Sequence, residues 1–482
     1  MREDLREVLK KILIPVLPGG MGLGVTGWKI ARLLEKIGGL GTISGVAIHV
    51  IIARQLQLGD PDGDLKRAFD AFPFSEVAER VYEKYFVPIG KKNYLGFRDP
   101  EQFSINPSRE LIELVVVANF AEVFLAKDGH NGLVGINYLE KVQMPHIYSL
   151  FGAMLAGVDF VVVGAGIPSQ FPLILENLVN RKPVEYKLDV TGAMSGEFVM
   201  RFDPEESFSE FPIPDLVRPY FLPIISSTVL GKWFAKKFPE QIDAFVIERP
   251  IAGGHNAPPR DRVTLMTGGE PLYGLKDEVN LEAIRLLGIP YFLAGGFAHP
   301  EKASEAIAKG AVGIQVGSIF QYSNESGLVS WLRSLARAMA FEKKLKILTS
   351  LVSPTGYPFK VAQIPGTLSE QDVYEKRVRF CHIRLLSELY KKKDGSLGYR
   401  CSAEPENEYV KKGGKFEICK GKVCLCNCLL ANIGLPQTRG NGYVEPPLVT
   451  SGDDDSFLIK LMKNSSDTYG AKKALDYILG KK

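Results

Sequence analysis

No cysteine precedes Cys381 in this chain of 482 residues, and four of the six cysteines lie between Cys419 and Cys428. A secreted disulfide framework spreads its cysteines along the chain and normally follows a signal peptide. The N-terminus has mixed charges in an amphipathic pattern, with neither a basic n-region nor an A-x-A-like cleavage site. We therefore expect a cytoplasmic protein whose thiols are reduced or bind a metal.

Long apolar runs and blocks of like charge are also missing. No stretch approaches about 18 uninterrupted apolar residues, so no membrane span is expected. The 59 Lys and Arg against 55 Asp and Glu give a formal net charge of +4, without basic blocks that follow a nucleic-acid backbone. We expect a small-molecule substrate, no nucleic acid and no membrane as partner. The sequence leaves a homo-oligomer open.

Short apolar segments, most of them ending in Gly, Ser or Asn, recur through the first two thirds of the chain. Several are apolar on both faces, as strands of a buried parallel sheet are. Helical patterns such as GWKIARLLEKIG and HPEKASEAIAKG lie between many of them and indicate βα units. Eight such strands predict an α/β protein with a closed (β/α)8 TIM barrel. The segments are 12–20, 40–45, 133–137, 160–168, 220–227, 244–249, 291–297 and 312–318.

The alternative is an open doubly wound sheet, but no GxGxxG with an acidic residue on a following strand supports a dinucleotide site. Residues 46–131 contain helical stretches, are too long for a simple βα loop, and predict a helical cap insertion over one end of the barrel. The segments VEYKLDV and GEFVMRFD predict a β-hairpin.

The barrel is expected to comprise residues 1–45 and 132–340. Residues 341–482 form a Cys-rich C-terminal module, either separate or wrapped around the barrel.

Glycine follows several of the predicted strands. The active site of a (β/α)8 barrel lies at the C-terminal ends of its strands, and the loops after the last two strands frequently bind phosphate. AGGF at 294–297 and VGS at 316–318 occupy those two places, with Ser318 adding a hydroxyl donor. A single glycine is more often an ordinary tight turn. The two turns together predict a phosphate-bearing cofactor.

The glycine motifs resemble one family. PGGMG, GIN, GAGIP, AGGH, AGGF and GIQVGSIFQYSNES follow one another between residues 18 and 326. They are similar to the nitronate monooxygenase (2-nitropropane dioxygenase) family of FMN-dependent (β/α)8 barrels and to the related flavin-dependent enoyl-acyl-carrier-protein reductases. The match is more specific for this superfamily than for one reaction.

The resemblance implies FMN as the cofactor and a set of contacts for it. Glu248 stands where the family often carries Asp. The residues implied at the flavin ring or along its site are Gly20, Met21, Asn137, Ser226, Glu248, Gly253 and Gly254. Those implied at the phosphate are Gly295, Gly296, Gly317 and Ser318.

His255 matches the catalytic histidine of the family. Its implied task is to remove the acidic proton beside a nitro group or to stabilise the nitronate, and the family then oxidises the nitronate to a carbonyl compound and nitrite. An imidazole with an ordinary pKa of about 6.5 accepts a proton near neutral pH. Without the flanking glycines, a lone His is more often an ordinary loop residue. His130, in AKDGHNG, is a weaker candidate.

The cysteines form a second candidate site. Thiolates gathered in a reducing compartment favour zinc or an iron–sulfur cluster, and the spacing C-x4-C-x-C-x-C leaves both open. Longer chains of the family resemble this one in RCxAEP and CLCN, which favours Cys381, Cys401, Cys424 and Cys426 as ligands of a structural metal site. The small nitronate monooxygenases and the enoyl reductases lack such a segment.

Three functions follow from these patterns. The leading hypothesis is an FMN-dependent nitronate monooxygenase-like oxidoreductase, which consumes oxygen with a nitronate and needs no nicotinamide. An alternative on the same scaffold is an NAD(P)H-dependent flavin enoyl-thioester reductase acting on ACP or CoA esters. The alternative of another class is a non-catalytic flavin- or metal-binding assembly protein. The physiological substrate, the electron acceptor and the identity of the metal stay open.

Overall fold

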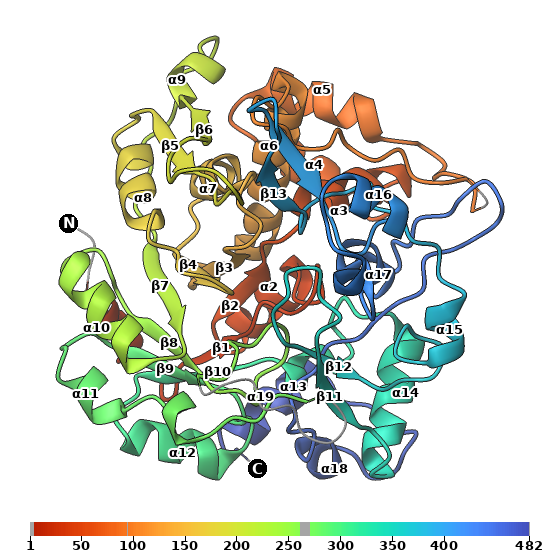
Figure 1. The fold of residues 1–482 in the computed structure, drawn as a ribbon. Coiled ribbons are helices and arrows are strands. Elements are labelled where there is room, and N and C mark those ends of the chain that lie inside the picture. The colour runs from red at the N-terminus through yellow and green to blue at the C-terminus, as the bar shows by residue number, and fades with distance from the viewer. Residues whose placement is uncertain (1–3, 94, 261–269, 482) are drawn as a thin grey trace.

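Eight parallel strands form the centre of the computed structural model, which describes residues 4–93, 95–260 and 270–481 (Figure 1). They neighbour one another in chain order, and β10 pairs with β1. The N–H of Leu40, directly before β2, donates to the Val16 carbonyl of β1 at 3.1 Å and closes the ring. The predicted (β/α)8 barrel is confirmed, and each predicted segment overlaps one strand. The strands are β1 (Val16–Pro18), β2 (Gly41–Ser44), β3 (Val134–Leu139), β4 (Phe160–Gly164), β7 (Tyr220–Ile225), β8 (Phe245–Glu248), β9 (Tyr291–Ala294) and β10 (Gly313–Val316).

Side chains along the strands alternate between the barrel interior and the surrounding helices. In β4, Phe160 and Val162 belong to the interior cluster, whereas Val161 packs in the larger core outside the barrel. Both faces are therefore buried, which explains why the strands are continuous apolar runs. The helix α1 (Leu5–Leu9) adds its two terminal leucines to the interior cluster and so covers the amino end of the barrel.

Helices that follow the strands form the outer layer. In α2, Ile30, Ala31 and Leu34 are buried at the spacing of one helical face. None of the helices in the described ranges has the length and apolar character that a membrane crossing requires. The layer consists of α2 (Trp28–Lys36), α6 (Arg109–Lys127), α7 (His146–Leu155), α8 (Phe171–Val179), α10 (Thr228–Lys237), α11 (Leu281–Arg285), α12 (Pro300–Ala308), α13 (Ser318–Gln321) and α14 (Ser330–Phe341).

The insertion between β2 and β3 lies against the side of the barrel. Its last helix, α6, packs between α2 and α7 and so takes the place of a barrel helix, and three further helices pack on α6 (Figure 1). Within the described part of residues 46–131, Val46 alone lines the cavity at the carboxyl end of the barrel. The insertion thus covers the flank, and the walls of the mouth come from elsewhere. The three helices are α3 (Ile48–Gln57), α4 (Asp64–Asp70) and α5 (Ser75–Tyr85).

Two smaller elements follow β4. The predicted hairpin is present as the antiparallel pair β5 (Val184–Lys187) and β6 (Val199–Phe202), with Val184 opposite Phe202. The short helix α9 (Pro204–Ser207) follows it, and the 3-10 turn Leu275–Asp277 precedes α11.

The chain after α14 crosses the mouth of the barrel and then returns along its side. Its last helices, α18 and α19, pack against α14 and α2 respectively, so this C-terminal segment is in contact with the barrel layer (Figure 1). The elements of the segment are β11 (Ile347–Ser350), β12 (Phe359–Ala362), α15 (Gln371–Glu375), β13 (Glu388–Lys391), β14 (Leu397–Arg400), α16 (Glu406–Lys411), a 3-10 turn (Phe416–Cys419), α17 (Leu425–Ala431), α18 (Phe457–Leu461) and α19 (Ala471–Ile478).

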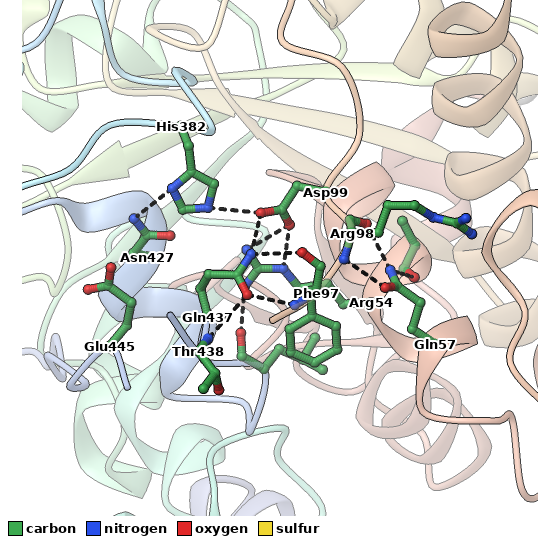
Figure 2. Close-up of polar contacts among 12 residues, drawn as sticks. Arg54, Gln57, Phe97, Arg98, Asp99, His382, Asn427, Gln437, Thr438 and Glu445 are labelled. Atoms are coloured by element: carbon green, nitrogen blue, oxygen red, sulfur yellow. Dashed lines mark hydrogen bonds and ion pairs between the residues drawn. The ribbon is translucent and has the colours of Figure 1, made fainter. Parts of the chain in front are cut away.

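A buried polar network ties the insertion to the C-terminal segment (Figure 2). Asp99 accepts hydrogen bonds from Arg54 Nε at 2.8 Å and Gln437 Nε2 at 2.7 Å, and its Oδ2 lies 2.9 Å from His382 Nε2. Arg54 also donates to the Leu435 carbonyl at 2.6 Å. Because Arg54 is fully buried, its charge needs these partners. The network therefore fixes two parts of the chain that are far apart in sequence.

Candidate functional site

A cavity of about 200 Å³ lies at the carboxyl ends of the strands, where (β/α)8 barrels place their active sites. Three polar side chains enter it from strands: Asn137 from β3, Glu248 from β8 and Gln315 from β10. Each occupies an inward-facing position, as Glu248 does two residues after the interior residue Val246. The register that buries apolar side chains lower in the barrel thus directs polar ones into the cavity at its mouth.

Glycine turns form much of the remaining wall. The Gly20 N–H donates to Asn137 Oδ1 at 3.2 Å, and a Cβ on Gly20 would lie 2.6 Å from the Cβ of Asn137. Gly295 and Gly296 have φ values of 91° and 79°, in the left-handed region that glycine adopts without strain. These turns leave backbone N–H groups accessible to a ligand in the cavity.

Most of the residues implied at a cofactor line this one cavity together with His255. They are Gly20, Met21, Asn137, Glu248, Gly253, Gly254, Gly295, Gly296, Gly317 and Ser318. The exception is Ser226, which lines a separate small hollow, where Arg260 donates to its carbonyl. His130 precedes β3 and therefore lies at the opposite end of the barrel, with its Nε2 at 2.7 Å from the Ala126 carbonyl.

His255 lies in the cavity wall and is held by the C-terminal segment. Its Nε2 is 2.7 Å from Ser353 Oγ, and its ring stands edge-on to Phe359 with centroids 4.8 Å apart. Burial, assisted by the positive charge of Lys141, lowers the pKa of His255 to about 4. The expected ordinary pKa is therefore wrong: the imidazole is neutral at pH 7 and is a weaker base than an exposed histidine.

Glu248 has the opposite shift. Burial raises the pKa of its carboxyl to about 8, so the group is mostly protonated at pH 7 and has a hydrogen to donate to a ligand. Glu248 lines the main cavity on one side and the small hollow beside Arg260 on the other. The site at neutral pH therefore presents two uncharged polar groups, His255 and Glu248.

Gln315 supplies a further donor. In the described structure its Nε2 is buried without a hydrogen-bond partner, and the residue lines the cavity. An unpaired buried amide donor costs about 1–3 kcal/mol. A ligand that places an acceptor against Gln315 relieves this cost.

Thr450, Ser451 and Gly452 are among the residues of the C-terminal segment that line the cavity without having been expected there. The Gly452 N–H donates to Ser318 Oγ at 2.9 Å, and Thr450 Oγ1 accepts from the Gly254 N–H at 2.8 Å. No pattern in the surrounding VEPPLVTSG indicates these contacts, because they depend on the path of the chain back across the barrel.

The four cysteines favoured as metal ligands all lie in the C-terminal segment, and Cys426 also lines the cavity. Among the described residues, no three His, Cys, Asp or Glu side chains are placed to bind one metal ion. A site for a single ion is therefore not seen in this part of the chain.

The fold and the site define a (β/α)8 barrel protein with a glycine-lined cavity at its carboxyl mouth. No protein-family model and no curated protein matches the chain. Among solved structures, FabK from Thermotoga maritima is 14% identical, with 100% of this chain and 96% of that chain covered and a TM-score of 0.49. Nitroalkane oxidase from Streptomyces ansochromogenes is 12% identical, with 98% and 97% covered and a TM-score of 0.45.

The enoyl reductase domain of MlnA from the macrolactin biosynthesis cluster of Bacillus amyloliquefaciens is also similar to this chain. It is 12% identical, with 99% of this chain and 96% of that chain covered and a TM-score of 0.47. Structural similarity at 12% to 14% sequence identity does not determine the substrate or the cofactor of this chain.

Proposed function

We propose that the protein is a flavin-dependent oxidoreductase that binds FMN non-covalently at the carboxyl mouth of the barrel. The observation that supports this most is the meeting of glycine turns from several strands with uncharged polar side chains in one cavity. The Gly295–Gly296 and Gly317–Ser318 turns present backbone N–H groups, which suit a phosphate. Ser318 Oγ accepts a hydrogen bond from Gly452, so its own hydrogen can be donated to a phosphate oxygen.

The other end of the cavity fits a flat ring with carbonyl acceptors. Glu248, protonated at neutral pH, and Gln315, whose Nε2 is buried without a hydrogen-bond partner in the described structure, both line the cavity and carry donor groups. Gly20 and Met21 leave room for a ring because the glycine has no side chain and methionine is adaptable. Bound FMN would supply one- and two-electron redox chemistry.

The first candidate reaction is oxidation of an alkyl nitronate to a carbonyl compound and nitrite. His255 stands in the cavity wall with its ring oriented by Ser353 and Phe359. In this role His255 takes the proton next to the nitro group, or steadies the nitronate once that proton has left. Its neutral form at pH 7 is the form that accepts a proton.

The second candidate is reduction of an unsaturated acyl thioester by NAD(P)H. A specific observation favours it: a second cavity of about 510 Å³ shares Leu385 and Leu386 with the first, so this short stretch separates the two. The second cavity has apolar residues such as Phe103 and Ile383 in its lining and also Lys141 and Lys415. An acyl chain suits the apolar lining, and anionic carrier groups suit the lysines.

Two measurements test the proposal in turn. Denatured protein should release FMN, and release of FAD, or failure of the folded protein to retain added FMN, would contradict the assignment of the cofactor. Oxygen consumption with an alkyl nitronate in the absence of nicotinamide would then support the first reaction. Oxidation of NAD(P)H with an unsaturated acyl thioester would support the second. Bound FMN without turnover in either assay would favour the non-catalytic alternative.

A further inference from the structure

A chain of hydroxyl groups leads from His255 away from the barrel mouth. His255 Nε2 lies 2.7 Å from Ser353 Oγ, and Ser353 Oγ lies 2.8 Å from Thr355 Oγ1. His255 lines the main cavity, whereas Thr355 lines the second cavity of about 510 Å³. In the described structure Ser353 is fully buried and lines neither cavity. The three side chains therefore connect the two cavities by hydrogen bonds.

The turn SPTG at residues 353–356 fixes both hydroxyls. The Gly356 N–H donates to the Ser353 carbonyl at 3.2 Å and closes the turn. Proline at the second position and glycine at the fourth are typical of such a turn. The buried ammonium of Lys422 donates to the same carbonyl at 2.9 Å, and the Thr355 N–H donates to Ser353 Oγ at 3.2 Å. The backbone of one turn thus sets the positions of the two hydroxyls.

The two hydroxyls have the right number of hydrogens to pass a proton. Ser353 Oγ accepts the Thr355 N–H, and Thr355 Oγ1 accepts the Tyr357 N–H at 3.3 Å. A hydroxyl has one hydrogen and two acceptor positions, so Ser353 keeps one hydrogen and one acceptor position for His255 and Thr355. The chain can therefore donate toward the second cavity or toward the imidazole. A proton path needs both directions, because each proton that passes reverses the chain.

The two ring nitrogens of His255 have different surroundings. Nε2 is bonded to Ser353, and no described residue is a hydrogen-bond partner of Nδ1. Nδ1 is thus the nitrogen left for a ligand in the main cavity. Burial and the positive charge of Lys141 lower the pKa of His255 to about 4. An imidazolium formed there therefore releases a proton readily.

The far end of the chain has access to water. The second cavity reaches the protein surface, because Lys415 and Ile418 in its lining are exposed. We propose that Ser353 and Thr355 form a proton relay between His255 and water in this cavity. The relay rests on the proposed function only in taking His255 as the group that exchanges a proton with the substrate.

In the outward direction, the relay removes the proton that His255 takes from a substrate. Nδ1 accepts the proton, and the electron pair of the C–H bond stays on the substrate. Nε2 then gives its hydrogen to Ser353, and Ser353 gives its own to Thr355. Thr355 gives its own hydrogen to water. Each hydroxyl gains one hydrogen and loses one, so the net change is one proton moved from substrate to water.

In the inward direction, the same groups deliver a proton. Water gives a proton to Thr355, the hydroxyls pass one on to Nε2, and Nδ1 gives its hydrogen to an anion in the main cavity. This restores the first tautomer of His255. The outward direction suits deprotonation of a nitroalkane, and the inward direction supplies the proton that an enoyl thioester needs on reduction. Both candidate reactions can therefore use the relay.

The first test measures exchange of the His255 ring hydrogen with water in the resting protein, without substrate. Nuclear magnetic resonance of protein containing isotope-labelled histidine reports this exchange, and His255→Gln assigns the signal. Thr355→Val keeps the shape of the side chain and removes its hydroxyl. We expect exchange at Nε2 to slow by about tenfold or more, because one group of the acid–base chain is missing. Thr355→Ser keeps a hydroxyl and should exchange at the wild-type rate.

Thr367→Val is the matched control. Thr367 Oγ1 lies 2.8 Å from Ser369 Oγ, as Thr355 Oγ1 does from Ser353 Oγ, but Thr367 lines neither cavity. This variant should exchange as the wild type does, and circular dichroism shows whether each protein is folded. If Thr355→Val does not fold, Thr355→Ala carries the same expectation. An unchanged rate in the folded Thr355 variant, or equal slowing in the control, would overturn the relay.

The second test separates proton transfer from support of the fold. In FMN-loaded protein, Thr355→Val should slow turnover of a neutral nitroalkane by about tenfold or more. Turnover of a pre-formed nitronate should stay nearly unchanged, because that substrate gives up no proton. Equal losses on both substrates would show that Thr355 acts through the structure and would refute the relay. If neither substrate is turned over, the first candidate reaction fails, and the exchange measurement still decides the relay.

Discussion

His255 shows at the scale of one residue how burial changes the chemistry expected of an imidazole. Because its pKa is lowered to about 4, the group is already deprotonated over the whole neutral range. We expect kcat/KM with a neutral nitroalkane to show no inflection near pH 6.5 and to fall only as the pH approaches about 4. A pH profile of the FMN-loaded protein checks this, and an inflection near 6.5 would contradict it.

The substitution His255→Ala should lower the rate of turnover of a neutral nitroalkane by about 10²–10⁴-fold. It should lower the rate with a pre-formed nitronate less, because that substrate has already lost its proton.

Glu248 has the complementary pH dependence. Burial raises its pKa to about 8, so below that pH the carboxyl is a hydrogen-bond donor for a bound ligand and above it the group is a buried anion. We expect FMN affinity to fall between about pH 7 and pH 9, because the donor is lost and a negative charge appears in the cavity. Glu248→Gln keeps a neutral donor at every pH. Fluorescence titrations with FMN across this range should therefore be flat for the variant, and a parallel decline in both proteins would exclude Glu248 as the cause.

Position 20 has no room for a side chain larger than that of glycine. An added Cβ would lie 2.6 Å from the Asn137 Cβ, so Gly20→Ala must displace Asn137 and narrow the cavity. We expect the variant to retain less than a tenth of the wild-type FMN while the fold is kept. Gly440→Ala is the matched control, because a Cβ there meets no atom within 4 Å. Equal flavin content in the two variants would show that the Gly20 turn is not part of the cofactor site.

At the scale of the element, the stretch from Thr450 to Gly452 acts as an additional wall of the barrel mouth. Thr450 Oγ1 accepts the Gly254 N–H at 2.8 Å, directly beside His255. Thr450→Val keeps the shape of the side chain and leaves that N–H without its partner, which costs about 1–3 kcal/mol. We expect weaker FMN binding and a lower free energy of unfolding. The exposed Thr468, which accepts from Asn324 at 3.3 Å, provides a control in Thr468→Val, where denaturant titration should show little change.

At the scale of the whole molecule, Asp99 joins the insertion to the C-terminal segment (Figure 2). Burial alone would raise its pKa, but hydrogen bonds with His382 and Arg54 outweigh burial and lower it. Asp99→Asn leaves buried Arg54 without its carboxylate, and such a loss costs about 3–5 kcal/mol of unfolding free energy. Urea denaturation measures this, with Asp394→Asn as the control, because Asp394 bonds only within its own turn to Ser396.

The sign of the pH dependence follows from the lowered pKa of Asp99. The unfolded state binds the proton more readily, so the contribution of Asp99 is fully present above its ordinary pKa of about 3.9 and is lost as the pH falls through the folded-state value. The difference between wild type and Asp99→Asn should therefore shrink below about pH 4. A difference that stays constant down to pH 2 would show that the carboxylate charge is not what joins the two segments.

The sequence alone determined the barrel and most of its mouth. Eight apolar runs ending in Gly, Ser or Asn specify strands buried on both faces, and closure follows because parallel strands with helical crossovers have few other packings. Asn137 and Glu248 enter the cavity because the two-residue period of a strand carries through to its end. These features depend on residues that are close together in the chain, so the sequence pattern alone predicts them.

Only the tertiary structure decided what surrounds these residues. Ser226 follows β7 as expected, yet it faces a hollow beside Arg260, because the loop after β8 folds over it. The contacts of Thr450 with Gly254 and of Gly452 with Ser318 join residues whose separation in the chain carries no periodic signal. The low pKa of His255 likewise arises from burial by the C-terminal segment. A sequence specifies which groups are present, but their solvation and their partners exist only once distant segments have packed.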